Sequence, residues 1–148
     1  MKRIVYLLVS IVCTIKCDAQ VEISNSQLIG KKWERVLPVQ MIEGDTTIIT
    51  FTKKYIENYH YRINHNDIFQ FKHKYYITNT EPSYVQFANE DVGKERKGRY
   101  IVFYNAKVNS IDFYTVMSLT DNELVLHHKA LPKSIPKLDM TIVYKRVW

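Results

Sequence analysis

The amino-acid sequence predicts an all-β protein, a single antiparallel up-and-down barrel of about eight strands that is preceded by a cleaved signal peptide. Three observations predict this organisation. A short apolar segment follows two basic residues at the N-terminus. Runs rich in Ile, Val, Thr, Tyr and Phe then alternate with polar turn clusters. Inside several of these runs polar and apolar residues alternate, which is typical of an antiparallel sheet with one buried face.

The N-terminal segment has the successive regions of a secretory signal peptide. Lys2 and Arg3 precede an apolar run at residues 4–15, and small and polar residues follow it. The apolar run is too short for a membrane-spanning helix, which needs about 20 residues. We therefore expect removal of this segment rather than anchorage, and no transmembrane span in the mature chain.

Small residues indicate the cleavage site. Cys17 and Ala19 stand at the third and first positions before the bond between Ala19 and Gln20, where a signal peptidase requires small side chains. The predicted organisation is a signal peptide at residues 1–19 and one domain at residues 20–148. The protein is then exported, either to the periplasm or out of the cell.

Cys17 also allows an alternative, because a lipoprotein signal ends at a cysteine that becomes acylated. The residue before such a cysteine is normally small, whereas Lys16 stands there, so plain cleavage is preferred. Both cysteines of the chain, Cys13 and Cys17, then leave with the signal. Removal of 19 of the 148 residues leaves 129, which must form one stable core without disulfides.

Eight runs are predicted as strands because of their β-branched and aromatic residues. In chain order they are Trp33–Val39, Thr46–Arg62, Phe69–Thr78, Ser83–Ala88, Arg99–Tyr104, Ser110–Leu119, Leu124–Lys129 and Met140–Val147. The turn clusters between them are Glu43–Asp45, Asn64–Asp67, Asn79–Ser83, Asn89–Gly98 and Thr120–Glu123. The stretch Ala130–Leu138 contains Pro132 and Pro136, which a central strand does not accept, so it is predicted as a loop at the rim of the barrel.

Alternation inside two of the runs assigns faces to their residues. In IENYHYRI, residues 56–63 at the end of the second run, Tyr59, Tyr61 and Ile63 share one face. In the third run, one face carries Phe71, His73, Tyr75 and Ile77. We expect these aromatic faces to point into the barrel.

The order of these segments resembles the small secreted lipocalin-like domains that are abundant in Bacteroidetes. The resemblance covers residues 27–147, and its most specific part is VMSLTDNELVLHHK from Val116 to Lys129, a strand, a tight polar turn and a strand. Tyr144 matches a tyrosine that closes the last strand in these proteins. The resemblance implies a short eight-stranded, calycin-like barrel in a family whose members are mostly of unknown function.

Gly30 and Trp33 are similar to the Gly-x-Trp start of true lipocalins, with one more residue between them. In lipocalins a late arginine packs over this indole and plugs the closed end of the barrel, and Arg146 stands near the end of the last predicted strand. The resemblance therefore implies that Trp33 and Arg146 form a barrel plug. A cation–π contact of this kind is worth about 0.5–2 kcal/mol.

No pattern in the sequence predicts an enzyme, a metal site or a cofactor. The histidines lack acidic or cysteine partners at metal-ligand spacing; they are His60, His65, His73, His127 and His128. Nucleophile-elbow, zincin and phosphate-loop motifs are absent from the sequence. The formal net charge is +6, and the densest basic run, Lys94–Arg99, is predicted as an exposed hairpin tip. Such a run is too small a basic face for nucleic acid.

Two functional hypotheses follow from the predicted fold. The first is a binding module that holds a small apolar or amphipathic ligand inside the barrel, with candidate contacts at Phe51, Tyr59, Tyr61, Phe71, Tyr75, Phe103 and Phe113. The second is a filled barrel that binds an envelope or secreted protein partner through its loops, with Tyr84, Phe87 and Ala130–Leu138 as anchors. The triplet Asp45-Thr46-Thr47 resembles an O-glycosylation site of exported Bacteroidetes proteins, although a turn explains it equally well.

Overall fold

A computed structural model of the protein describes residues 21–36, 45–62, 66–129 and 140–148. The signal peptide predicted at residues 1–19 and the rim loop predicted at Ala130–Leu138 lie outside the described residues. Cleavage after Ala19 therefore stays a prediction, and acylation at Cys17 stays the less favoured alternative.

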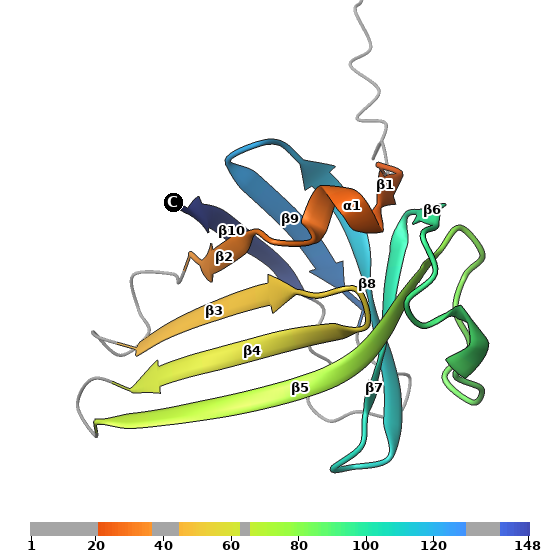
Figure 1. The fold of residues 1–148 in the computed structure, drawn as a ribbon, viewed down its shortest axis with the longest axis horizontal. Coiled ribbons are helices and arrows are strands. Elements are labelled where there is room, and N and C mark those ends of the chain that lie inside the picture. Colours follow the sequence, from red (N-terminus) through yellow and green to blue (C-terminus); the bar gives the residue numbers. More distant parts are fainter. Residues whose placement is uncertain (1–20, 37–44, 63–65, 130–139) are drawn as a thin grey trace, which may run out of the picture.

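Eight strands close into an antiparallel barrel (Figure 1). They are β2 (Lys32–Arg35), β3 (Asp45–Phe51), β4 (Tyr55–Arg62), β5 (Asp67–Thr78), β7 (Tyr100–Asn105), β8 (Ser110–Leu119), β9 (Glu123–His128) and β10 (Met140–Val147). Each strand pairs with the next along the chain, and β10 pairs with β2 to close the barrel. The prediction of an all-β antiparallel barrel is confirmed.

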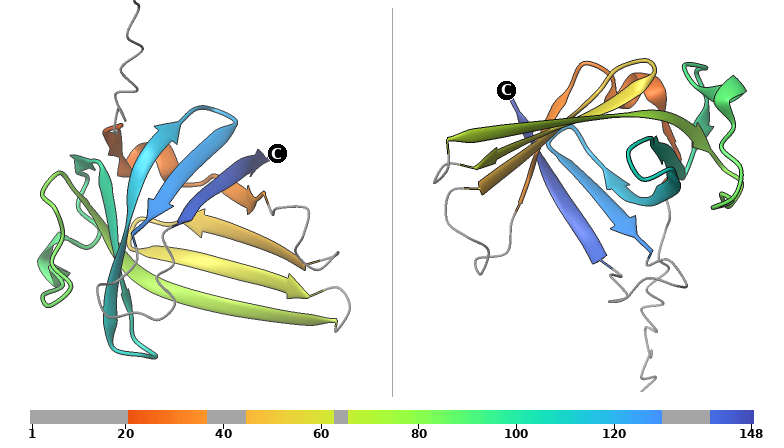
Figure 2. Two further views of the ribbon diagram at one scale, coloured as in Figure 1. Left: turned by 180° about the vertical axis from the view of Figure 1, so that it is seen from behind. Right: turned by 90° about the horizontal axis from the view of Figure 1, so that it is seen from below.

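Four short elements lie outside the barrel wall. They are β1 (Ile23–Ser24), α1 (Asn25–Leu28), the 3-10 helix η2 (Asn89–Asp91) and β6 (Lys97–Gly98). β1 and β6 pair with each other as a separate two-stranded sheet. Both views in Figure 2 show the segment that carries η2 on the outside of the barrel. No helix in the described part of the chain has the length and apolar character needed to cross a membrane.

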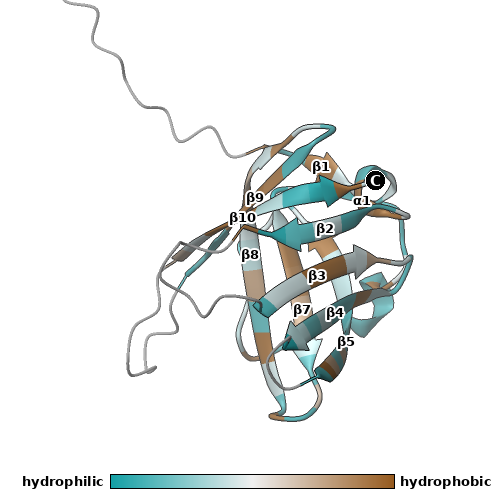
Figure 3. Cartoon of the chain, turned by 90° about the vertical axis from the view of Figure 1, so that its left-hand side faces the viewer, coloured by the Kyte–Doolittle hydropathy of each residue, from teal (hydrophilic) through white to brown (hydrophobic). Residues whose placement is uncertain are grey.

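Alternate residues of each strand face the interior, and Figure 3 shows the resulting bands of hydrophobic and hydrophilic residues. On β9, Leu124 and Leu126 are fully buried, whereas Val125 between them is only half-buried. The buried cluster continues through Ile49 of β3 and Ile101 of β7. Burial of one face explains why a period of two in the sequence predicts this fold.

The predicted run Thr46–Arg62 is in fact two strands, β3 and β4, joined by a tight turn at Thr52. The backbone N–H of Thr52 donates to the carbonyl oxygen of Tyr55 at 2.8 Å. Its Oγ1 accepts from the backbone N–H groups of Lys54 and Tyr55 at 3.4 and 3.0 Å. The threonine hydroxyl stabilises this turn, a role that Gly, Asn or Pro usually fills. The segment therefore lacks the residues by which a turn is predicted from a sequence.

The predicted strand Ser83–Ala88 is not a strand in the structure. Its aromatic side chains cover the outer wall of the barrel instead. The ring of Tyr84 lies 5.1 Å from that of Phe113, and the ring of Phe87 lies 5.2 Å from that of Tyr76. The aromatic residues that predict a strand here are explained by this packing, which forms a second hydrophobic cluster outside the barrel.

Helix α1 lies across one end of the barrel and closes it (Figure 1). Leu28, the last residue of this helix, is fully buried. Asn25 is only 2% exposed; its Oδ1 accepts from the backbone N–H of Arg96 at 3.0 Å, and its Nδ2 donates to the Tyr75 hydroxyl at 3.4 Å. Because both ends of this buried amide have partners, Asn25 fixes α1 over the core.

The basic run Lys94–Arg99 is exposed along most of its length, but it is not a hairpin tip. Two of its cations pair with Asp91: the Arg96 guanidinium lies 2.6 Å and the Lys94 ammonium 3.4 Å from the carboxylate. Gly98 is buried in β6, opposite Ile23 of β1. The glycine is needed for close packing rather than for a turn.

Candidate functional site

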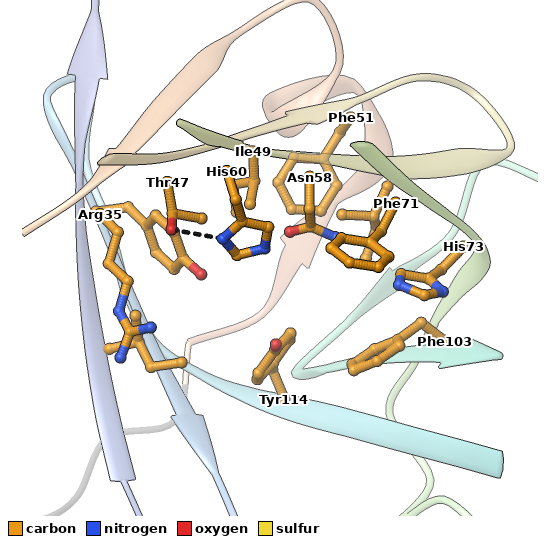
Figure 4. Close-up of a pocket in the computed structure, with 13 residues that line it drawn as sticks. Arg35, Thr47, Ile49, Phe51, Asn58, His60, Phe71, His73, Phe103 and Tyr114 are labelled. Atoms are coloured by element: carbon orange, nitrogen blue, oxygen red, sulfur yellow. Dashed lines mark hydrogen bonds between the residues drawn. The ribbon is translucent and has the colours of Figure 1, made fainter. Parts of the chain in front are cut away.

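The barrel contains a cavity of about 190 Å³ (Figure 4). Six apolar side chains line it: Ile49, Phe51, Ile56, Phe71, Phe103 and Ile142. The remaining lining residues are polar: Arg35, Thr47, Asn58, His60, His73, Tyr114 and Tyr144. The cavity is therefore amphipathic, and sequence reasoning named only its aromatic part.

Four predicted ligand contacts lie on the inner face of the barrel. Phe51, Phe71 and Phe103 line the cavity, with Phe71 and Phe103 close to His73 in Figure 4. Tyr75 lies nearer the closed end, where it is fully buried. Its ring meets that of Phe51 edge-on at 5.6 Å, and its hydroxyl donates to the carbonyl oxygen of Thr52 at 2.9 Å. Tyr75 is thus a core residue beneath the cavity.

The predicted inward orientation of Tyr59 and Tyr61 is wrong. Residues alternate along β4 as expected, but Asn58 and His60 are the ones that line the cavity. Tyr59 lies outside, where its hydroxyl donates to Glu57 Oε2 at 3.1 Å. The sequence rule that the apolar face points inward fails here because this half of the interior is polar.

Phe113 also faces outward, contrary to the prediction. It lies in the outer aromatic cluster, edge-on to Tyr100 at 5.8 Å and near Tyr84 at 5.1 Å. Its neighbour Tyr114 points into the cavity instead (Figure 4). β8 carries aromatic residues on both faces, because Tyr84 and its neighbours bury the outer one, so hydrophobicity alone does not indicate which face is interior.

The predicted barrel plug has only one of its two residues in the expected place. Trp33 is fully buried at the closed end and pairs in register with Arg146 of β10. The Arg146 guanidinium, however, stacks on the ring of Trp148 at 4.0 Å, and the cation facing the Trp33 ring is Lys31 Nζ at 5.9 Å. The exposed ring of Trp148, two residues further on, offers Arg146 a face that the buried indole does not.

Burial sets the protonation of the polar groups in the cavity. It raises the pKa of Tyr144 to about 12 and also raises the pKa of Tyr114, so both phenols stay protonated at neutral pH. His60 accepts from or donates to Thr47 Oγ1 through Nδ1 at 2.9 Å. Burial, together with the charge of Arg35, lowers the pKa of His60, which favours the neutral imidazole.

Several polar atoms in the cavity lack protein partners. Within the described ranges, the hydroxyls of Tyr114 and Tyr144 and the amide of Asn58 make no hydrogen bond to the protein. Nδ1 of His73 is buried without a partner there as well. Of these atoms, Nδ1 of His73 is the one that is fully buried. Because buried polar atoms in proteins are almost always paired, we expect water or a bound molecule at that nitrogen.

We expect the neutral histidines to make stability depend on pH. The pKa of His60 and that of His73 are lowered by burial, whereas in the unfolded chain each takes up a proton near its ordinary value of 6.5. The unfolded state then binds more protons, so stability falls as the pH drops below about 6.5. Urea unfolding midpoints at pH 7.5, 6.5 and 5.5 measure this fall.

The variant His60→Gln isolates the contribution of one histidine. Glutamine does not titrate, so the variant should lose less stability than the wild type between pH 6.5 and pH 5.5. A wild type whose stability rises as the pH falls through this window, or a variant with an unchanged slope, would contradict the assignment.

Comparison with protein-family models, curated proteins and solved structures finds no match to this chain. In the part of the chain that the structure describes, no three His, Cys, Asp or Glu side chains gather as a metal site would require. The class of this protein is therefore defined by its fold alone. It is a closed eight-stranded antiparallel β-barrel, consistent with a lipocalin-like fold. Arg35 and Tyr144, paired on neighbouring strands, are among the cavity residues that sequence reasoning missed as a site.

Proposed function

We propose that this protein is an exported, lipocalin-like binding protein that holds one small, partly apolar molecule inside its barrel. The amphipathic cavity of about 190 Å³ carries the proposal. A barrel of eight strands is just wide enough to hold one small ligand. A ligand that contacts the aromatic wall and also bonds the tyrosine hydroxyls would complete polar groups that are otherwise unpaired.

Exposed apolar side chains around the barrel end support entry of such a molecule. Val36 follows β2, Ile68 begins β5, and Val108 lies between β7 and β8; they are 45%, 66% and 67% exposed. These positions belong to the same end of the barrel as Arg35 and His60. An apolar rim lowers the cost of moving a partly apolar ligand from water to the interior.

The alternative function is a filled barrel that binds a protein partner, and two of the residues predicted to anchor that partner are not free to do so. Tyr84 and Phe87 pack in the outer aromatic cluster rather than standing free, and Ala130–Leu138 lies outside the described residues. We therefore propose a carrier or sequestering role, without catalysis, in the periplasm or secreted fraction. The membership in a Bacteroidetes lipocalin-like family and glycosylation at Thr46 or Thr47 remain proposals from the sequence.

The test is native mass spectrometry of the protein purified from the cells that produce it. We expect a small molecule that survives purification and is released on denaturation. The variant Phe71→Trp places a larger ring in the cavity and should weaken binding at least tenfold, which corresponds to about 1.4 kcal/mol. Tyr59→Trp makes a similar change on the outer face of the neighbouring strand and should leave binding unchanged.

Two outcomes would contradict the proposal. One is a protein of clean apo mass that also fails to bind apolar probes of one-ring size. The other is equal loss of binding in both tryptophan variants, because that would locate the ligand outside the cavity.

A further inference from the structure

We propose that the ligand of this cavity is a small carboxylic acid, whose carboxylate meets Arg35 and Tyr144 while its ring or short chain lies against Phe71 and Phe103. The inference rests on the proposed function and specifies its ligand class. It is carried by an arginine whose charge is unmatched at the cavity wall, together with hydroxyl donors beside it.

Arg35 brings a permanent positive charge to the cavity. It lines the cavity at the end of β2, and it pairs in register with Tyr144 of β10, so both side chains lie on the inner face. Among the described residues its guanidinium makes one hydrogen bond, a weak donation from Nη2 to Met140 Sδ at 3.9 Å. A guanidinium has five donors in a planar fork, which matches a carboxylate.

The charge of Arg35 acts on the groups that surround the cavity. It helps to lower the pKa of His60 and opposes the rise in the pKa of Tyr114 and of Tyr144. Figure 4 shows Arg35 at one side of the cavity and His73 and Phe103 at the other. His60, whose ring lies edge-on to that of Phe71 at 5.5 Å, stands between them. The electrostatic field of the arginine therefore reaches across the space that a ligand would fill.

The carboxylate nearest to Tyr114 along the chain is that of Asp112, whose charge contributes to the raised pKa of Tyr114 but whose oxygens are bonded to other groups. Asp112 Oδ2 lies 2.7 Å from His128 Nε2, and Asp112 Oδ1 accepts from the backbone N–H of Phe113 at 2.8 Å. In the described part of the chain, Arg35 has no carboxylate in ion-pair contact. Arg35 is half-buried at the cavity wall. A partly desolvated guanidinium without a counter-ion there favours an anionic ligand.

Neutral donors complete the anion site. The Tyr144 and Tyr114 phenols remain protonated because burial raises the pKa of each, so each can donate to a carboxylate oxygen. Neither hydroxyl has a protein acceptor among the described residues. Donors that are already in place lower the cost of ordering the ligand.

The size and the opposite wall of the cavity limit the rest of the ligand. The volume of about 190 Å³ is only slightly above that of a cavity of about 150 Å³ that holds one benzene ring. Phe71 and Phe103 line the far side, and Phe103 stacks on Tyr114 with ring centroids 5.1 Å apart. One ring or a short chain fits there, whereas a long acyl chain would have to extend out of the barrel.

The test compares acids with their neutral amides on the purified protein. Phenylacetate and hexanoate are titrated beside phenylacetamide and hexanamide, with binding followed by NMR chemical shifts of the backbone amides. We expect at least one acid to bind tenfold or more tightly than its amide. Arg35→Gln should abolish this ratio while leaving the affinity for the amide unchanged.

Lys145→Gln is the matched control. Lys145 is exposed on the outer face of β10, where it pairs in register with Glu34. The variant therefore removes one positive charge without altering a residue that lines the cavity. It should keep the preference for the acid. Equal loss of that preference in the two variants would assign it to overall charge and overturn the inference.

The remaining outcomes separate this inference from the proposed function. If acids and amides bind equally well, the anion site is refuted while the small-molecule barrel stands. If no acid and no amide shifts any resonance of the folded protein, the anion site is refuted. The small-molecule barrel still stands in that case if an apolar one-ring probe such as toluene binds, and failure of toluene as well would refute the carrier function.

Discussion

Replacing Trp33 with alanine should lower the free energy of unfolding by about 3–5 kcal/mol, which for a domain of this size is a large part of its total stability. The Trp33 side chain is fully buried and belongs to the main hydrophobic cluster with Leu28, Leu124 and Leu126. Its removal leaves a void at the closed end, where α1 and the strand ends meet. The described residues contain no cysteine, so no disulfide among them offsets the loss of packing in the core.

Trp148→Ala is the control, since these two are the only tryptophans of the chain. Trp148 is 86% exposed, so its removal should change stability by less than about 0.5 kcal/mol. Trp33→Phe gives an intermediate case: it keeps most of the packing and deletes an indole N–H that has no partner in the described structure. Urea unfolding followed by circular dichroism ranks the three. Similar losses for Trp33→Ala and Trp148→Ala would mean that the closed end is not a packed core.

The strands of the barrel can be predicted from the sequence because burial of one face imposes a period of two on each of them. Leu124 and Leu126, two residues apart on β9, follow this rule, because both are fully buried. The rule fails where a side chain substitutes for a usual turn residue, as Thr52 does between β3 and β4. It also fails at Tyr84 and Phe87, whose hydrophobicity serves packing on the outside of the barrel rather than strand formation.

The site is less predictable than the fold, because its residues depart from the pattern that identifies the core. Asn58 and His60 face inward although the tyrosines beside them are more hydrophobic, and they do so because the cavity is partly polar. One signal for Arg35 was present in the sequence: it stands two residues after Trp33 on the same strand and hence shares its face. The alternation along a strand does not reveal that Tyr144 lies beside Arg35. That neighbourhood depends on the pairing of β10 with β2, which closes the barrel.

Replacing Gly98 with alanine should destabilise the protein by about 3 kcal/mol, at the upper end of the range for overpacked sites. A Cβ at this position would lie 2.3 Å from both the carbonyl carbon and the carbonyl oxygen of Thr78. These are backbone atoms of β5, so no side-chain rotation relieves the clash. β6 would have to move away from β5, and with it the segment whose Arg96 N–H bonds the buried Asn25 that holds α1 over the core.

Two variants distinguish this clash from other effects of losing a glycine or of altering β6. Lys97→Ala changes the exposed neighbour and should leave the urea midpoint within the error of the wild type. Gly30→Ala meets no atom within 4 Å, but it forces alanine to a φ of +77°, so a loss of about 1–2 kcal/mol is expected from backbone strain alone. Hydrogen exchange at Arg96 gives a local readout, because its amide should lose protection in Gly98→Ala. A normal midpoint with full protection at Arg96 would show that the close contact between β5 and β6 does not constrain the fold.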